Sequence, residues 1–113
     1  MNYKVKPIPN FLKDLKQLAK RYPSIKRDLH TLGISLQANP HLGTDLGKGL
    51  RKVRMAITSK GRGKSGGARI ITLNVILNEN EGELLLITIY DKAERSTISV
   101  QEIDELLIKN GLK

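Results

Sequence analysis

The chain has 113 residues, with 20 Lys and Arg against 11 Asp and Glu, which gives a formal net charge of +9 at pH 7. A chain of this length is expected to form one domain over residues 1–113 and to fold without a covalent staple. Cysteine is absent, which excludes disulfides, thiolate catalysis and Cys-based zinc sites.

The sequence pattern also argues against a secreted or membrane-spanning protein and against a histidine-based metal site. The N-terminal residues lack the apolar core of a signal peptide, and the most apolar run, residues 84–90, is too short to cross a bilayer. The two histidines, His30 and His41, lie far apart and lack the spacing of metal ligands. We therefore expect a soluble, cytoplasmic protein with no membrane partner, no metal and no cofactor.

The first half of the chain is predicted to form a strand and two helices. Residues 3–8 alternate like a short edge strand. Asn10 is expected to cap a helix that stops at Pro23, because the apolar residues between them follow helical spacing. Ser24 is expected to cap a second helix, which ends at Asn39 before a proline. So short a connection predicts an antiparallel helical hairpin.

The second half is predicted to be a sheet followed by a helix. We expect three strands, at residues 50–57, 69–77 and 84–91. The alternation in the first of them brings Lys52 and Arg54 out on one face. A capping-box pattern at Ser99 predicts a last helix over residues 100–110. The prediction is an α+β fold with an antiparallel sheet and the order β-α-α-β-β-β-α.

One stretch of this sheet region carries a concentration of cations and no Asp or Glu. Its eight basic residues are Lys48, Arg51, Lys52, Arg54, Lys60, Arg62, Lys64 and Arg69. The other residues are nearly balanced, with 12 basic and 11 acidic side chains. Such an excess on a sheet predicts a surface that holds phosphate in a fixed geometry. The alternative is a solvated basic face that keeps the protein soluble.

Three segments in order, at residues 49–54, 61–71 and 86–94, resemble a known family. With the helical hairpin that ends in Asn39-Pro40 before Gly43, they resemble the RelE/HigB superfamily of toxins from prokaryotic type II toxin–antitoxin modules. Gly-Lys-Ser-Gly-Gly-x-Arg before the middle strand resembles its HigB-like branch. The resemblance implies a small RelE-like fold and a metal-independent endoribonuclease, an mRNA interferase that inhibits translation. Such a toxin cleaves mRNA on the ribosome, in the 30S decoding site, and is held inactive by a cognate antitoxin protein.

Metal-free RNA cleavage needs groups that move protons and groups that stabilise phosphate charge. Arg69 is the first candidate for phosphate, because its forked donors match two non-bridging oxygens, and Arg54 is the second. Lys52 is the candidate for proton transfer, because the surrounding cations disfavour its charged form. Tyr90 is the other titratable candidate and is also expected to be able to stack on a base.

The remaining cations are expected to contact RNA outside the reaction centre. These RNA-binding candidates are Lys48, Arg51, Lys60, Arg62, Lys64 and Lys92. The glycine-rich loop over residues 63–67 leads into a strand and lacks the spacing of a nucleotide P-loop, which excludes that motif.

The chain departs from the best-known RelE pattern at two positions. That pattern has an arginine where Ala93 stands and a catalytic tyrosine where Ser99 stands. Either Lys52, Tyr90 and Lys92 take over the acid–base roles, or a carboxylate (Asp91 or Glu94) serves as base, or the chain cleaves slowly.

Two other functions remain open on the same fold. The missing arginine and tyrosine favour a non-catalytic module that binds RNA or the ribosome. A ParE-like toxin would bind DNA gyrase and lack the nuclease cluster, but the presence of Lys52, Arg54 and Arg69 argues against it.

Overall fold

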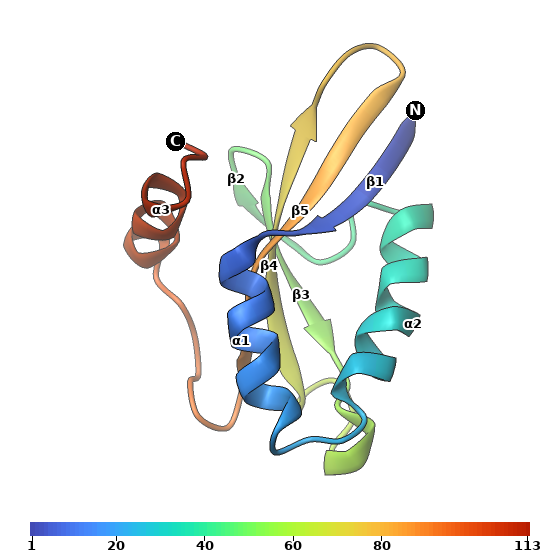
Figure 1. Cartoon of the computed structure of the whole chain (residues 1–113), viewed down its shortest axis with the longest axis vertical. Coiled ribbons are helices and arrows are strands. Elements are labelled where there is room, and N and C mark those ends of the chain that lie inside the picture. The colour runs from blue at the N-terminus through green and yellow to red at the C-terminus, as the bar shows by residue number, and fades with distance from the viewer.

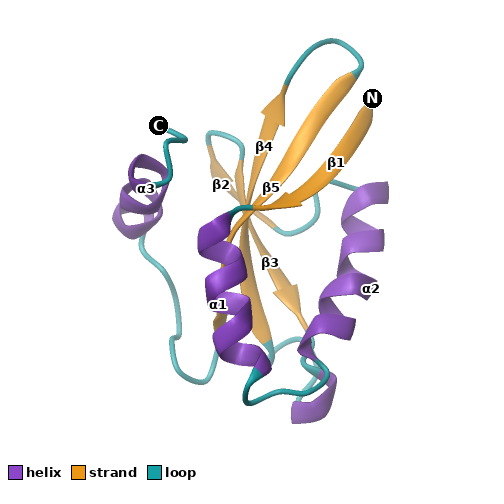
Figure 2. Cartoon of the chain, in the orientation of Figure 1, coloured by secondary structure: helices purple, strands orange, loops and turns teal.

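A five-stranded sheet in the order β1-β5-β4-β3-β2 organises the computed structural model, which describes residues 1–113 (Figures 1 and 2). Its elements are β1 (Asn2–Pro7), α1 (Pro9–Ala19), α2 (Ile25–Ala38), β2 (Thr44–Gly47), β3 (Leu50–Met55), the 3-10 turn η1 (Thr58–Lys60), β4 (Ala68–Ile76), β5 (Glu81–Asp91) and α3 (Val100–Lys109). No helix combines the length and the apolar character needed to span a membrane.

The pairing of the strands confirms the central meander and corrects its edges. Strands β3, β4 and β5 pair antiparallel in sequence order, as the sequence predicts. Strand β1, however, pairs parallel to β5, so the sheet is mixed and not wholly antiparallel. The sequence pattern also misses β2, because Thr-Asp-Leu-Gly has too few apolar residues to show the alternation of a strand.

Both faces of the sheet are covered, each by different helices. Helices α1 and α2 pack on one face, where Phe11, Ile25 and Ile70 are fully buried. Helix α3 packs on the other face through Ile103, which is 1% exposed. Figure 1 shows α3 joined to β5 by a long linker and lying well apart from α2. Ile71, next to Ile70 in β4, is also fully buried, as expected for a strand between two layers.

The two helices of the hairpin start and stop differently from prediction. Helix α1 begins at Pro9 without a side-chain cap, because Asn10 instead donates to the backbone oxygen of Ile87 at 3.0 Å. It ends at Ala19, one turn before Pro23. Ser24 flanks α2, but its side chain accepts from no backbone N–H of that helix and accepts instead from the N–H of Ser59. Tertiary partners therefore replaced both predicted caps, whereas the capping box at the start of α3 is present as predicted.

Candidate functional site

The strand register brings the candidate residues into one row across the sheet. Arg54 on β3 lies opposite Arg69 on β4, and Arg69 lies opposite Tyr90 on β5. Directly opposed residues of antiparallel strands share a face. Lys52 lies in the next row on that face, opposite Ile71. Four residues from three different strands thus come together on the face that α3 partly covers.

Lys52 and Arg54 are the accessible members of this group. Arg54 is exposed and Lys52 is half-buried, while Val53 between them points into the opposite core. Neither cation has a carboxylate within ion-pair distance. Their charges are therefore available to a ligand from solution.

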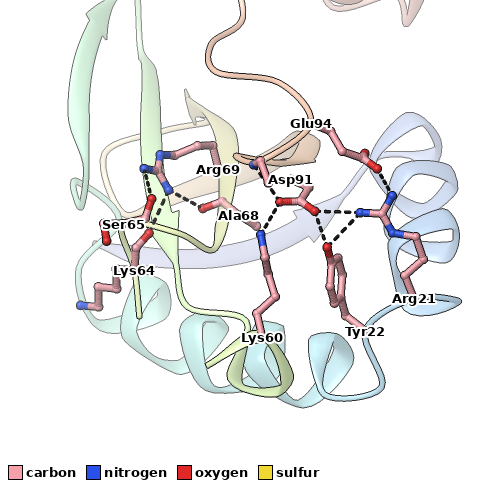
Figure 3. A network of polar contacts seen from close by, with 10 residues as sticks. Arg21, Tyr22, Lys60, Lys64, Ser65, Ala68, Arg69, Asp91 and Glu94 are labelled. Carbon is pink, nitrogen blue, oxygen red and sulfur yellow. Dashed lines mark hydrogen bonds and ion pairs between the residues drawn. The ribbon is translucent and has the colours of Figure 1, made fainter. Parts of the chain in front are cut away.

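Arg69 lies behind them and is already engaged. Its side chain is 5% exposed, and its guanidinium donates to the backbone oxygens of Lys64 (2.9 Å), Ala68 (3.2 Å) and Ser65 (3.2 Å), as Figure 3 shows. Burial, with the positive charge of Arg54, lowers the pKa of this guanidinium. The expectation of a free fork for phosphate is wrong for this structure, because two of its five donor hydrogens hold the backbone of the preceding loop and a third donates to the backbone oxygen of Ala68.

That loop, residues 61–67, is a glycine-rich segment fixed at its end. Gly67 packs so closely on β3 that a Cβ atom there would lie 2.1 Å from the backbone oxygen of Met55, so no other residue fits without a shift of the backbone. The loop presents Arg62 and Lys64 to solvent. The cationic loop is thus held in place at the end that leads into β4.

Tyr90 is sealed inside the molecule. It is 8% exposed, and its hydroxyl is buried without a hydrogen-bond partner, although the backbone of Ile98 lies near enough to influence it. Burial raises the pKa of Tyr90, and the nearby charges of Arg69 and Arg95 offset only part of this effect. The phenol is therefore neutral at pH 7 and can donate a proton. The expectation that its ring stacks on a base is wrong for this structure, because the ring is covered.

Arg95 is a neighbour of this row that the sequence patterns missed. Its guanidinium carbon lies 5.8 Å from the centre of the Tyr90 ring, a cation–π geometry. It also donates to the backbone oxygen of Thr97 and pairs with Glu102 at the start of α3. Arg95 stands two residues after Ala93, the position at which the resemblance placed an arginine. Only the path of the linker between β5 and α3 shows that Arg95 lies over the Tyr90 ring.

Asp91, the last residue of β5, is the centre of a buried polar network (Figure 3). Its carboxylate is 1% exposed and accepts from Lys60 (2.7 Å), the Tyr22 hydroxyl (2.5 Å), Arg21 (2.8 Å) and the backbone N–H of Ala93 (3.0 Å). Burial alone would raise the pKa of Asp91, but the hydrogen bonds from Lys60, Tyr22 and Ala93 outweigh it and hold the pKa below its usual value. A carboxylate so fully engaged is not a free general base.

Three of the predicted RNA-binding cations are likewise occupied. Lys60 is bound to Asp91 and its side chain is 11% exposed. Arg51 donates to the backbone oxygen of Gly43 (3.1 Å) and lies 3.7 Å from Asp45. The ammonium of Lys92 donates to the backbone oxygen of Ser96 (2.8 Å), and Glu94, the other carboxylate considered as a base, pairs with Arg21. The free cations of the stretch are Lys48, Lys52, Arg54, Arg62 and Lys64.

The free cations do not form one compact patch. Lys48 lies on the turn between β2 and β3, at the end of β3 opposite to Arg54, so at least about 13 Å of strand separates the two. Lys48 has a positive φ of 55° between two glycines that also have positive φ, as a tight turn requires. No group of three or more His, Asp or Glu side chains is placed to hold a metal ion.

Comparison with known proteins supports the fold. No protein-family model matches the chain. Among solved structures, the chain is similar to the toxin RelE of E. coli, a double arginine-to-alanine mutant in the free state. The TM-score is 0.59 at 12% sequence identity, over 96% of this chain and 98% of that one. The chain therefore has a RelE-like α+β fold.

Proposed function

We propose that this protein is the toxin of a type II toxin–antitoxin module, of the HigB-like branch, and that it cleaves mRNA on the ribosome as a metal-independent endoribonuclease. The observation that carries the proposal is the row of Arg54, Arg69 and Tyr90, flanked by Lys52, on the open end of one sheet face. Cations without partners supply the charge stabilisation that phosphoryl chemistry requires.

The chemistry assigns a different task to each of these residues. Arg54, exposed and unpaired, binds the non-bridging oxygens of the scissile phosphate. Lys52 accepts the proton of the attacking 2′-hydroxyl. Arg69, which is buried next to Arg54, adds positive charge to the site and holds the loop that carries Lys64. Each donor aimed at the developing charge contributes a factor of about 10² to 10³ to the rate.

Tyr90 is the proton donor to the departing 5′ oxygen in this proposal. A neutral phenol suits that role, because burial raises its pKa. Its hydroxyl is covered in the free protein, so the role requires the linker with Arg95 to shift when RNA binds. A cognate antitoxin would then need only to keep RNA from the Lys52 and Arg54 face.

One observation favours a second function, a non-catalytic module that binds RNA or the ribosome. Ala93 and Ser99 lack the side chains of the RelE pattern, and Tyr90 is sealed, so Lys52, beside the row, is the one accessible candidate for proton transfer. A module of this kind would keep the free cations and lose the cleavage. A ParE-like gyrase-binding toxin is less well supported, because it has no need for the unpaired Lys52 and Arg54.

The experiment that tests the proposal is a translating extract that contains an end-labelled message. The parent protein is expected to produce cuts in register with codons, and Lys52→Gln and Arg54→Gln are expected to abolish them. Lys16→Gln, which removes an exposed cation from α1, is the matched control and is expected to cleave like the parent. Ribosome binding without cuts would support the non-catalytic module, and defects in DNA supercoiling would support the gyrase-binding toxin.

A further inference from the structure

The polar network around Asp91 joins three parts of the chain at one carboxylate (Figure 3). Arg21 and Tyr22 come from the turn between α1 and α2, Lys60 comes from η1, and Asp91 closes β5. Arg21 and Lys60 also lie over the Tyr22 ring, with 5.0 Å and 5.6 Å to its centre. The network thus brings the helical hairpin, η1 and the end of β5 together at one buried carboxylate.

We propose that Asp91 and Lys60 form a clamp that positions the cationic loop, residues 61–67, against the row of Arg54, Arg69 and Tyr90. Neither residue contacts RNA in this proposal, so both are positioning residues. The part that concerns cleavage rests on the proposed nuclease function, whereas the ordering of the loop does not.

The clamp acts at both ends of the loop. Lys60 directly precedes Gly61, which has a φ of 70°, so the ion pair with Asp91 fixes the point at which the loop begins. At the other end, the backbone oxygen of Gly67 accepts from the N–H of Lys92 at 3.0 Å. The loop is therefore tied at its start to residue 91 and at its end to residue 92.

The same carboxylate also fixes the turn that follows Tyr90. One oxygen of Asp91 accepts from both Lys60 and the backbone N–H of Ala93, while the other accepts from Tyr22 and Arg21. A change at Asp91 would therefore move the loop and the chain after Tyr90 together. The loop that carries the exposed cations and the chain after the covered phenol of Tyr90 therefore share Asp91 as a support.

Stability alone is a weak explanation for so buried an ion pair. Desolvation of two charges can exceed their attraction, and apolar residues of similar volume are often as stabilising. What the ion pair adds is a fixed geometry, because the four donors around Asp91 define the relative positions of the chain segments that carry them. A clamp of this kind suits a loop whose cations must meet a phosphate within a fraction of an ångström.

The first measurement is hydrogen exchange of the loop, which needs no activity. In Asp91→Asn and in Lys60→Met, the hydrogen-bonded amides at the two ends of the loop, those of Gly61, Gly67 and Lys92, are expected to exchange at least about tenfold faster than in the parent. Asp104→Asn is the matched control, because it makes the same chemical change at the exposed ion pair between Asp104 on α3 and Lys113, which follows that helix. Unchanged exchange in the loop of a folded Asp91→Asn protein would overturn the clamp.

The second measurement separates positioning from stability in the cleavage reaction. Asp91→Asn is expected to lower the single-turnover rate about 10- to 100-fold and to change RNA affinity by less than about threefold, because every free cation remains. The double variant Asp91→Asn with Lys60→Met removes the buried lone charge and is expected to recover stability without recovering rate. Recovery of the full rate together with stability would show a purely structural role. A parent that does not cleave would refute the proposed function, and the exchange data would still decide the clamp.

Discussion

Replacement of Arg54 by glutamine is expected to weaken the salt dependence of RNA binding by a calculable amount. Each phosphate of a single strand that a protein cation neutralises contributes about 0.7 to the log–log slope of affinity against salt. The five free cations of residues 48–69 therefore predict a parent slope near −3.5, or near −2.8 if the distant Lys48 makes no contact. Arg54→Gln is expected to flatten the slope by about 0.7.

Arg51 provides the internal comparison, because it lies on the same strand and carries the same charge. Its guanidinium is already bound to the backbone oxygen of Gly43 and lies near Asp45, so it has few counterions to release. Arg51→Gln is expected to change the slope by much less than Arg54→Gln. The structure thus predicts different results for two arginines that the composition of the sequence treats as equal.

The assay is fluorescence anisotropy of a labelled, unstructured RNA between about 50 and 200 mM salt. The RNA carries 2′-O-methyl groups, so that binding is measured without cleavage. Equal changes of slope for Arg54→Gln and Arg51→Gln would show that ion pairing in the free protein does not decide which cations meet phosphate. A parent affinity independent of salt would refute the electrostatic interpretation altogether.

Three further predictions concern single residues. Arg69→Ala is expected to reduce single-turnover cleavage about 10²- to 10³-fold, and Arg69→Lys is expected to restore only part of the rate, because an ammonium cannot span the carbonyls of Lys64 and Ser65. Burial would raise the pKa of Asp91, but hydrogen bonds outweigh burial and hold the pKa below its usual value, so the stabilisation is fully present at pH values well above the usual pKa of a carboxyl group. As the pH falls from there through the folded pKa, the unfolded state binds more protons, and the free energy of unfolding is expected to drop; urea titrations at several pH values should show a flatter profile for Asp91→Asn. Ser99→Ala, which removes the capping box of α3, is expected to lower the free energy of unfolding by about 1 kcal/mol in thermal or urea denaturation; no change would mean that the cap is redundant.

Local patterns predicted most of the elements because their causes are local. The aliphatic alternation of β4 and β5 and the capping box at Ser99 depend on residues within a few positions of one another. The edges of the sheet were harder to predict from the sequence. The parallel pairing of β1 with β5 joins residues about 80 positions apart, as in the pair of Asn2 and Glu81, and no local pattern marks such a partner.

The predicted helix caps were wrong where a distant hydrogen-bond partner competed with the local backbone amide. Asn10 and Ser24 have the composition of helix caps, but each found a better partner across the fold, Ile87 for Asn10 and Ser59 for Ser24. A cap contributes only about 1 kcal/mol, so a tertiary hydrogen bond of similar strength can replace it. Neither competitor lies close enough in the sequence to be recognised there.

The sequence by itself determined that cations are concentrated between residues 48 and 69, that Lys52 and Arg54 share a face, and that a RelE-like succession of elements carries them. Only the tertiary structure decided which charges are free. Arg54 stands unpaired, whereas Lys60 is bound to Asp91, 31 residues away, and Arg69 is bound to loop carbonyls. The physical reason is that a side chain's charge is a property of its residue type, but its availability depends on whether an acceptor lies within about 3 Å, and folding alone sets that distance.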